Sequence, residues 1–305
     1  MTRREAILGA LAVNALQSAS AQQIANARPF RLAVCNETFR GASFAEACHL
    51  AAATGYAGLE VMPSTLSPDP ARLSAAERAK ARKAMRETGL TFTGLHAVVS
   101  APAGLHLTTP DPSLRKRSWG CFRSMIDLAA DLGPDSYLVL GSSKQRAAAP
   151  GESVSDAVAR LRDGLAESAP LAQERGVMLL AEPLAPHLCN VLTSLEQAVR
   201  LVREINHPCV RAMFDTHNAV SETKPHGQLI REYASYIHHV HVNEVDGRHP
   251  GTGTYDFVDV LSALRSIRYG GWIALEVFHF EPSGEVVARE AATFLRRMEK
   301  SIPSR

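Results

Sequence analysis

Residues 153–183 read SVSDAVARLRDGLAESAPLAQERGVMLLAEP, and this stretch shows the unit from which the chain is built. Apolar residues recur at helical spacing over 153–175, which predicts an amphipathic helix. Gly176 then stands where a helix commonly ends in a left-handed residue. A short apolar run follows, which is typical of a buried strand, and it ends in the carboxylate of Glu182. The unit is therefore one helix, one glycine, one buried strand and one polar strand end.

The same unit recurs along the chain from Arg28 onward. Eight apolar runs lie at 31–37, 57–62, 91–97, 136–142, 177–183, 210–217, 237–244 and 272–278. Helical patterns alternate with them near 43–54, 74–88, 113–132, 153–175, 193–205, 227–235, 256–269 and 284–299. This alternation predicts parallel strands joined by right-handed crossovers. We expect an α/β fold, a single eight-stranded parallel (β/α)8 TIM barrel. An open doubly wound sheet is the alternative, but no glycine-rich phosphate loop follows the first run.

Local signals mark the ends of several expected helices. Thr193 and Asp256 stand where helix N-caps belong. The first four helices are each followed by a glycine where a left-handed C-terminal residue is common, namely Gly55, Gly89, Gly133 and Gly176. Trp272, at the start of the last run, is expected to pack in the outer layer.

The composition excludes several classes of protein. The chain has 305 residues, of which 46% are hydrophobic and 21% are charged, as is typical of globular domains. The net charge of +2 predicts neither a nucleic-acid partner nor an anionic membrane surface as a partner. The five cysteines include no C-x-x-C pair, so they predict no disulfide framework and no thiolate zinc site. No linker interrupts 29–305, so we expect one domain there. No stretch predicts a membrane span, and homo-oligomerisation is left open.

The first residues have the layout of an export signal. Arg3 and Arg4 precede a mildly apolar stretch from Ala6 to Leu16, and Ala19-Ser20-Ala21 is a small-x-small cleavage pattern. The arginine pair suggests the twin-arginine type. We therefore expect residues 1–28 to be a signal peptide with a short linker, and the location to be periplasmic or otherwise extracytoplasmic. An N-terminal amphipathic helix on a cytoplasmic protein is the alternative.

In a barrel of this kind the chemistry lies at the carboxyl ends of the strands. Strands five to eight end in or near Glu182, Asp215, His241 and Glu276. Three carboxylates and one imidazole that converge would carry a charge of −3, which a buried site tolerates only with a divalent cation. Oxygen-rich ligation with one imidazole suits Mn²⁺ first, with Mg²⁺ or Co²⁺ as alternatives, rather than structural zinc.

Other polar residues follow the earlier strands. Glu37 and His96 are expected to face a substrate, although His96 could equally be a hydrogen-bonded barrel histidine. Lys144 could hold polar substrate groups or belong to a solvated loop. Glu60 is expected to brace either the metal ligands or Lys144.

Several segments together carry a resemblance to a known family. They are GYAGLEV (55–61), LLAEPL (179–184), MFDTHNA (213–219), HHVHVNEVDGRHPGTGTYDF (238–257) and GGWIALEVF (270–278). The chain resembles the xylose isomerase-like barrel superfamily, in the branch that holds ketose 3-epimerases, hydroxypyruvate isomerases and inosose dehydratases.

The resemblance implies roles for named residues. Glu182 and Glu276 would serve as an acid/base pair as well as metal ligands. His217 and Arg248 would contact the substrate. Two departures concern specificity: the histidine follows the strand-six aspartate by two residues where many epimerases have three, and Leu188 stands where those enzymes have a substrate-binding glutamate.

These observations predict a divalent-metal-dependent isomerase or epimerase acting on a small sugar or glycoside. It would work through a metal-stabilised enediolate with the paired glutamates as acid and base. A lyase or epimerase on 3-keto-glycosides, which uses the same enediolate for β-elimination, is the close alternative. An abasic-site endonuclease shares the barrel but needs a three-zinc cluster, and strand four here ends in Gly141 and Ser142. A non-catalytic sugar-binding barrel would predict a broken ligand set. Which sugar and which carbon are left open.

Overall fold

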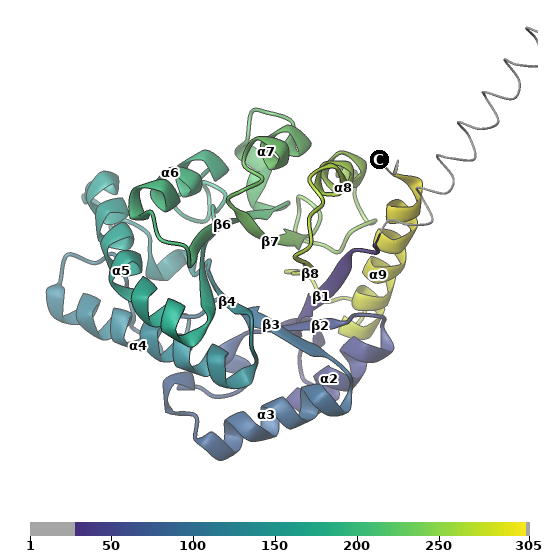
Figure 1. Cartoon of the computed structure of the whole chain (residues 1–305), viewed down its shortest axis with the longest axis horizontal. Coiled ribbons are helices and arrows are strands. Elements are labelled where there is room, and N and C mark those ends of the chain that lie inside the picture. The colour runs from purple at the N-terminus through teal and green to yellow at the C-terminus, as the bar shows by residue number, and fades with distance from the viewer. Residues whose placement is uncertain (1–27, 303–305) are drawn as a thin grey trace, which may run out of the picture.

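The computed structural model describes residues 28–302, and their eight strands form one closed barrel. The strands are β1 (Arg31–Cys35), β2 (Gly58–Val61), β3 (Thr91–Leu95), β4 (Ser136–Leu140), β5 (Val177–Ala181), β6 (Val210–Asp215), β7 (Ile237–Val242) and β8 (Trp272–Leu275). Each strand pairs in parallel with the next, and β8 pairs with β1. Figure 1 shows these strands at the centre of a ring of helices. The predicted TIM barrel is confirmed.

The helices follow the strands in the predicted order. They are α2 (Phe44–Ala53), α3 (Ala75–Glu87), α4 (Pro112–Leu132), α5 (Val154–Arg175), α6 (Leu195–Ile205), α7 (His226–Glu232), α8 (Phe257–Ser266) and α9 (Gly284–Ser301). Short 3₁₀ segments occupy loops at η1 (Asn36–Phe39), η2 (Pro63–Thr65), η3 (Pro70–Arg72), η4 (Ser143–Gln145) and η5 (Asn218–Ser221). Among the described helices, none has the length and hydrophobicity needed to cross a bilayer. The predicted signal peptide lies almost wholly outside the described residues.

Two of the predicted helix ends are wrong. Ser194, not Thr193, is the N-cap of α6, and its hydroxyl accepts the backbone N–H of Gln197. Thr193 instead donates to the Gln197 side chain, so it precedes the cap. Gly133 has a φ of 178°, which is extended backbone, so α4 ends without the left-handed residue that the glycine suggested.

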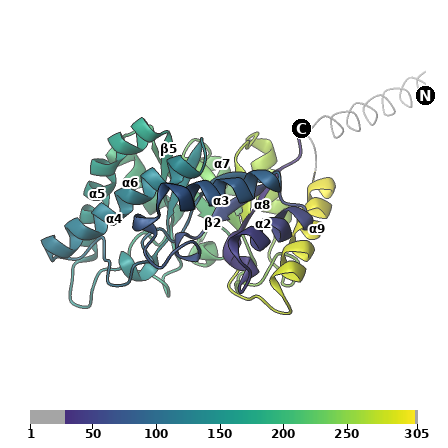
Figure 2. The same ribbon diagram turned by 90° about the horizontal axis from the view of Figure 1, so that it is seen from below.

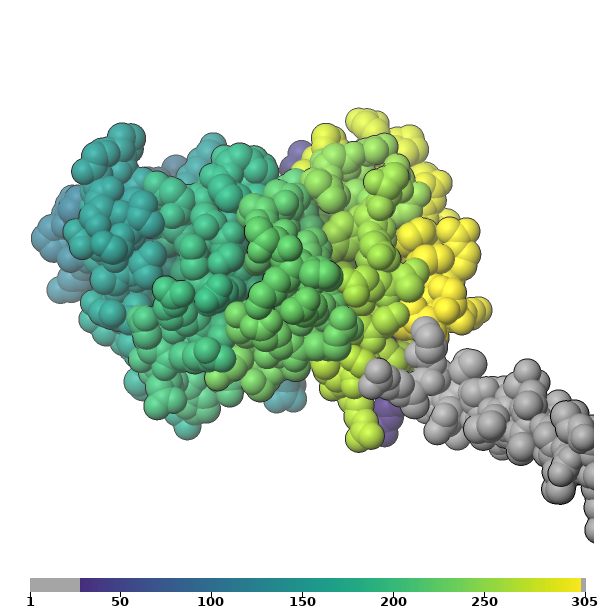
Figure 3. Space-filling model, turned by 90° about the horizontal axis from the view of Figure 1, so that it is seen from above, coloured from purple at the N-terminus to yellow at the C-terminus, as the bar shows by residue number. Residues whose placement is uncertain are grey.

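The last helix closes the ring against the start of the barrel. In Figures 1 and 2 the yellow α9 lies beside the purple first elements. Phe30 donates its backbone N–H to Glu299 over 2.6 Å, and Arg296 donates to the Phe30 carbonyl over 2.8 Å. The first strand and the last helix are therefore joined by hydrogen bonds to charged side chains, while β1 and β8 are joined by strand pairing. Figure 3 shows the side of the molecule on which the second half of the chain forms a continuous outer surface.

The barrel interior has an apolar cluster of its own, and it corrects the expectation for Trp272. The cluster is formed by strand residues that contact one another across the barrel: Ala33, Tyr137, Val139, Leu180, Met213, Trp272 and Ala274. Trp272 thus points inward, where the Arg31 guanidinium lies 3.8 Å from its ring centroid. Trp272 lies four residues before Glu276, and strand residues an even number apart point to the same face, here the barrel interior. The outer-layer prediction was wrong because it ignored that spacing.

A glycine on β3 makes room for the largest ring in this cluster. A Cβ on Gly94 would lie 2.3 Å from Cδ2 of Tyr137 and 2.5 Å from the Tyr137 carbonyl oxygen. Both distances are far below van der Waals contact, and one of the atoms belongs to a strand backbone that cannot easily move. Tyr137 can therefore occupy its place only because residue 94 has no side chain.

Gly94→Ala should destabilise the barrel by about 1–3 kcal/mol, the usual cost of overpacking a core. Gly120→Ala, in α4, is the matched control because a Cβ there meets no atom within 4 Å. The control should leave stability unchanged or raise it by up to about 1 kcal/mol through helix propensity. Urea unfolding measures both, and equal stabilities of the two variants would contradict the packing described.

Candidate active site

The carboxyl ends of β5 to β8 bring four predicted side chains to one point. Glu182 follows β5, Asp215 ends β6, His241 lies in β7 and Glu276 follows β8. One potential ligand atom from each lies within 4.8 Å of the others. The His241 Nδ1 atom faces all three carboxylates, at 3.1 Å from Glu276, 3.6 Å from Asp215 and 3.8 Å from Glu182. The structure thus brings together the four residues that the strand ends singled out.

The donor set fits a divalent cation. The Asp215 Oδ2 atom is buried and has no hydrogen-bond partner among the described residues. Its other oxygen accepts backbone N–H groups from His217 at 2.7 Å and Asn218 at 3.2 Å, which fixes the carboxylate. Burial, together with the charges of Glu276 and Asp215, raises the pKa of Glu182 well above its usual value. Three crowded carboxylates and one imidazole nitrogen form a donor set that can hold Mn²⁺, Mg²⁺ or Co²⁺.

Glu60 orients the histidine of this group from below. It lies on β2 and is fully buried, and its Oε1 is 2.9 Å from His241 Nε2. Its Oε2 accepts the Tyr137 hydroxyl at 2.6 Å and lies 2.8 Å from His239 Nε2. Burial alone would raise the pKa of Glu60, but His241 and His239 hold it well below its usual value. A carboxylate that holds one imidazole nitrogen leaves the other nitrogen free to bind a metal. Of the two expected roles for Glu60, the structure shows contacts with a proposed metal ligand.

Two residues after β4 shape the surroundings of Glu182. Arg146 is fully buried and donates to the carbonyls of Leu140 at 2.8 Å and Glu182 at 2.6 Å, which ties the ends of β4 and β5 together. A Cβ on Gly141 would lie 1.6 Å from Glu182 Oε2, so the carboxylate occupies space that any other residue would fill. Neither role could be predicted from the sequence, because both depend on how the loop turns.

Two of the proposed ligands, Glu182 and Glu276, line a cavity of about 380 Å³. Three of the residues predicted to contact substrate, namely Glu37, His96 and Lys144, also line it. His96 is 2% exposed, and its Nε2 lies 2.8 Å from Glu37 Oε1. The cavity combines carboxylates, an imidazole and one ammonium group, a set that can bind sugar hydroxyls.

The structure does not bring His217 and Arg248 to this cavity. The His217 Nδ1 atom is 2.7 Å from the Val245 carbonyl, and its ring packs beside Phe278. The half-exposed Arg248 is paired with Asp246 at 2.7 Å, and neither it nor His217 is among the described residues that line the cavity. After Asp215 the chain enters η5, whose turn directs Asn218 inward instead, and Asn218 donates to Glu182 Oε1 at 3.2 Å. Asn218 stands three residues after the aspartate, which is the spacing of the epimerase histidine.

Comparison with known proteins places this geometry in a family. Residues 48–298 match the family described as xylose isomerase-like TIM barrel. A D-psicose 3-epimerase from Ruminiclostridium cellulolyticum is 26% identical over 193 residues, which cover 62% of this chain and 64% of that enzyme.

Two solved structures share the fold. A D-psicose 3-epimerase determined in the presence of D-fructose superposes with a TM-score of 0.78 at 21% identity, over 89% of this chain and 100% of that one. A 3-keto-D-glucoside 4-epimerase from E. coli gives a TM-score of 0.77 at 18% identity, over 88% and 100% of the two chains. The closed barrel and the family match over most of its length lead to one conclusion: the chain belongs to the xylose isomerase-like TIM barrel family.

Proposed function

We propose that this protein is a divalent-metal-dependent sugar epimerase or isomerase that moves a proton on a carbon next to a carbonyl. The observation that carries the proposal is the convergence of Glu182, Asp215, His241 and Glu276 beside a cavity that the two glutamates line. The name of the D-psicose 3-epimerase relative supports this class of reaction. Mn²⁺ is the proposed ion, with Mg²⁺ or Co²⁺ as alternatives, because the donors are mainly oxygen atoms.

Glu182 and Glu276 are the proposed proton carriers. Both line the cavity, and they enter it from β5 and β8, which are separated by two strands in the barrel. Two carboxylates that approach from separate strands can reach a bound sugar from different sides, as inversion of a carbon centre requires. When bound, a divalent cation would act as a Lewis acid on the sugar carbonyl. Asn218 holds Glu182 in place, while Lys144 and the His96–Glu37 pair are positioned to bind hydroxyl groups.

A lyase or epimerase on 3-keto-glycosides is the second candidate, and the cavity rim favours it. Leu188 and Phe278 line the cavity and are 40% and 47% exposed. Leu188 replaces the glutamate that would bind a sugar hydroxyl in the epimerases that this chain resembles. An apolar rim contacts the bulky substituent of a glycoside better than it contacts a free hydroxyl. The same proton abstraction would then expel the substituent from the neighbouring carbon.

Asp215→Ala should abolish binding of Mn²⁺ at this site. With wild type, Mn²⁺ at 100 times its Kd should stabilise the fold by about 2.7 kcal/mol and raise Tm by about 5–10 °C. The variant should show no such rise, because it has lost the ligand whose Oδ2 lacks a partner. Asp163→Ala, an exposed change on α5, is the control and should respond like wild type. Calorimetric titration with Mn²⁺ measures the affinity, and unchanged binding by Asp215→Ala would rule out this ligand set.

Incubation of the metal-loaded enzyme in D₂O with a panel of ketoses and 3-keto-glycosides should place deuterium on carbon. Inverted sugars would identify an epimerase, aldose–ketose conversion would identify an isomerase, and a released aglycone would identify a lyase.

Glu182→Gln and Glu276→Gln should each lower turnover by about 10²- to 10⁴-fold, the usual contribution of a general base. In an epimerase each variant should keep exchange from one epimer only, and the two should differ in which one. If both variants retain Mn²⁺ and turn over normally, neither glutamate is the base.

We infer that residues 1–28 direct export through the twin-arginine route, since two arginines precede a mildly apolar stretch and a small-x-small site. A reporter fused to these residues should then reach the periplasm. Arg3→Lys combined with Arg4→Lys should stop export, whereas Arg28→Lys should not. Export that continues in the double variant would exclude this route and leave a cytoplasmic location open.

A further inference from the structure

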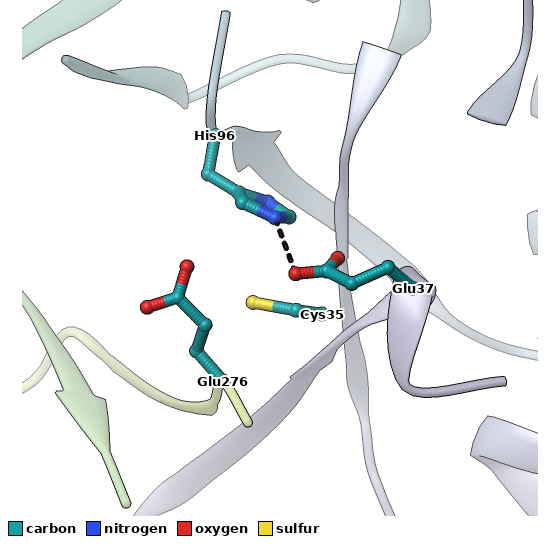
Figure 4. A group of neighbouring side chains, drawn as sticks. All are labelled: Cys35, Glu37, His96 and Glu276. Carbon is teal, nitrogen blue, oxygen red and sulfur yellow. Dashed lines mark hydrogen bonds and ion pairs between the residues drawn. The ribbon is translucent and has the colours of Figure 1, made fainter. Parts of the chain in front are cut away.

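A second group of ligand-type side chains lies beside the first. Cys35 ends β1, Glu37 lies in η1, His96 follows β3 and Glu276 follows β8. One potential ligand atom from each lies within 4.8 Å of the others. Figure 4 shows the Cys35 sulfur and the carboxylates of Glu37 and Glu276 around one space beside the His96 ring. Glu276 belongs to both groups, so the two lie next to each other.

His96 is held in the same way as His241. Its Nδ1 lies 3.2 Å from Glu60 Oε1, the same oxygen that is 2.9 Å from His241 Nε2. Its other nitrogen, Nε2, faces Glu37 at 2.8 Å, just as His241 Nδ1 faces the carboxylates of the first group. Each histidine therefore gives one nitrogen to Glu60 and the other to a set of anionic groups. A carboxylate behind the imidazole is the arrangement that orients metal-binding histidines.

The charge of the region leaves room for a second cation. Five carboxylates lie in this connected network, and each is at most 14% exposed: Glu37, Glu60, Glu182, Asp215 and Glu276. Fully ionised, they would carry a charge of −5, which the buried Arg146 guanidinium beside Glu182 reduces to −4 and one divalent cation to −2. Buried charge of one sign is costly unless it is compensated, and a second divalent cation compensates it further.

One atom of the second group lacks the contact that a purely structural role would give it. The Glu37 Oε2 atom is buried without a hydrogen-bond partner among the described residues. The thiol of Cys35 is fully buried and lies 3.6 Å from Glu60 Oε1. An alanine or valine would fill that position without placing a sulfur against a carboxylate.

The geometry points to a second metal site, formed by Cys35, Glu37, His96 and Glu276, that takes a softer divalent ion such as Zn²⁺ or Co²⁺. One sulfur, one nitrogen and two oxygen ligands suit tetrahedral zinc or cobalt better than Mn²⁺. Glu276 would bridge the two ions. Cys35 would bind as the thiolate and release its proton to solvent. The site goes beyond the proposed reaction but shares Glu276 with it, and a bound ion would take the place of the sugar hydroxyl groups proposed above as partners of the His96–Glu37 pair.

Titration of the metal-free, full-length protein with Co²⁺ tests the site directly. Wild type should bind two Co²⁺ per chain and develop the intense near-ultraviolet absorption of a cobalt–thiolate bond. Cys35→Ser should bind one Co²⁺ and lack that absorption. Cys189→Ser is the matched control, since Cys189 is also buried but belongs to no ligand group found in the described chain, and it should behave like wild type.

Two further variants separate this site from the first. Glu37→Gln, at the cavity wall, should weaken the second Co²⁺ by more than about 100-fold, since even an outer partner of a ligand is worth 10- to 100-fold in affinity. It also reports on the site should Cys35→Ser fail to fold. Asp215→Ala should keep the cobalt–thiolate absorption while it loses the other ion. A single Co²⁺ per wild-type chain without thiolate absorption, or absorption that persists in Cys35→Ser, would overturn the proposal.

Discussion

One buried carboxylate, that of Glu60, organises the centre of this barrel. It has no exposed surface, yet it contacts His241, His239, His96 and the Tyr137 hydroxyl. Removing a charge from water costs several kcal/mol, and only partners at hydrogen-bond distance offset that cost. The partners come from β3, β4 and β7, so these strands must keep their register for the charge to be tolerated. The geometry of the polar residues above Glu60 is thus a consequence of keeping one anion inside.

Toward the carboxyl ends of the strands, the barrel interior changes from apolar to charged within a short distance. Trp272, Tyr137 and their neighbours form an apolar cluster inside the barrel. The Tyr137 ring belongs to this cluster while its hydroxyl reaches Glu60, so one side chain joins the two environments. Beyond Glu60 lie the four proposed ligands and the cavity. The low dielectric of the apolar cluster strengthens every electrostatic interaction above it, which favours a firmly held cation.

The sequence was informative where the backbone is regular. Residues at strand ends are placed by the fixed alternation of strand side chains, and so the convergence of Glu182, Asp215, His241 and Glu276 could be predicted from the sequence. The same rule would have placed Trp272 inside the barrel. Loops obey no such period. The turn of η5 directs Asn218 rather than His217 to the cavity, and Arg248 is held outward by Asp246 only two residues away.

The contacts of Cys35 and Arg146 could not be predicted, for a different reason. A cysteine at the end of an apolar strand predicts only one more core residue, and an arginine in a loop predicts a solvated side chain. Their roles arise from neighbours that are distant in sequence: Glu60 for the thiol, and the carbonyls of Leu140 and Glu182 for the guanidinium.

The close approach of Gly141 and Glu182 limits how this barrel can evolve. The Glu182 carboxylate occupies the volume that any Cβ at residue 141 would need. A side chain could be gained at the end of β4 only if Glu182 rotated away or became shorter, as aspartate would. A side chain at residue 141 would therefore displace the Glu182 carboxylate from its place among the proposed ligands. A functional side chain added at the end of the fourth strand would thus disturb the proposed ligand on the fifth, unless residue 182 changed as well.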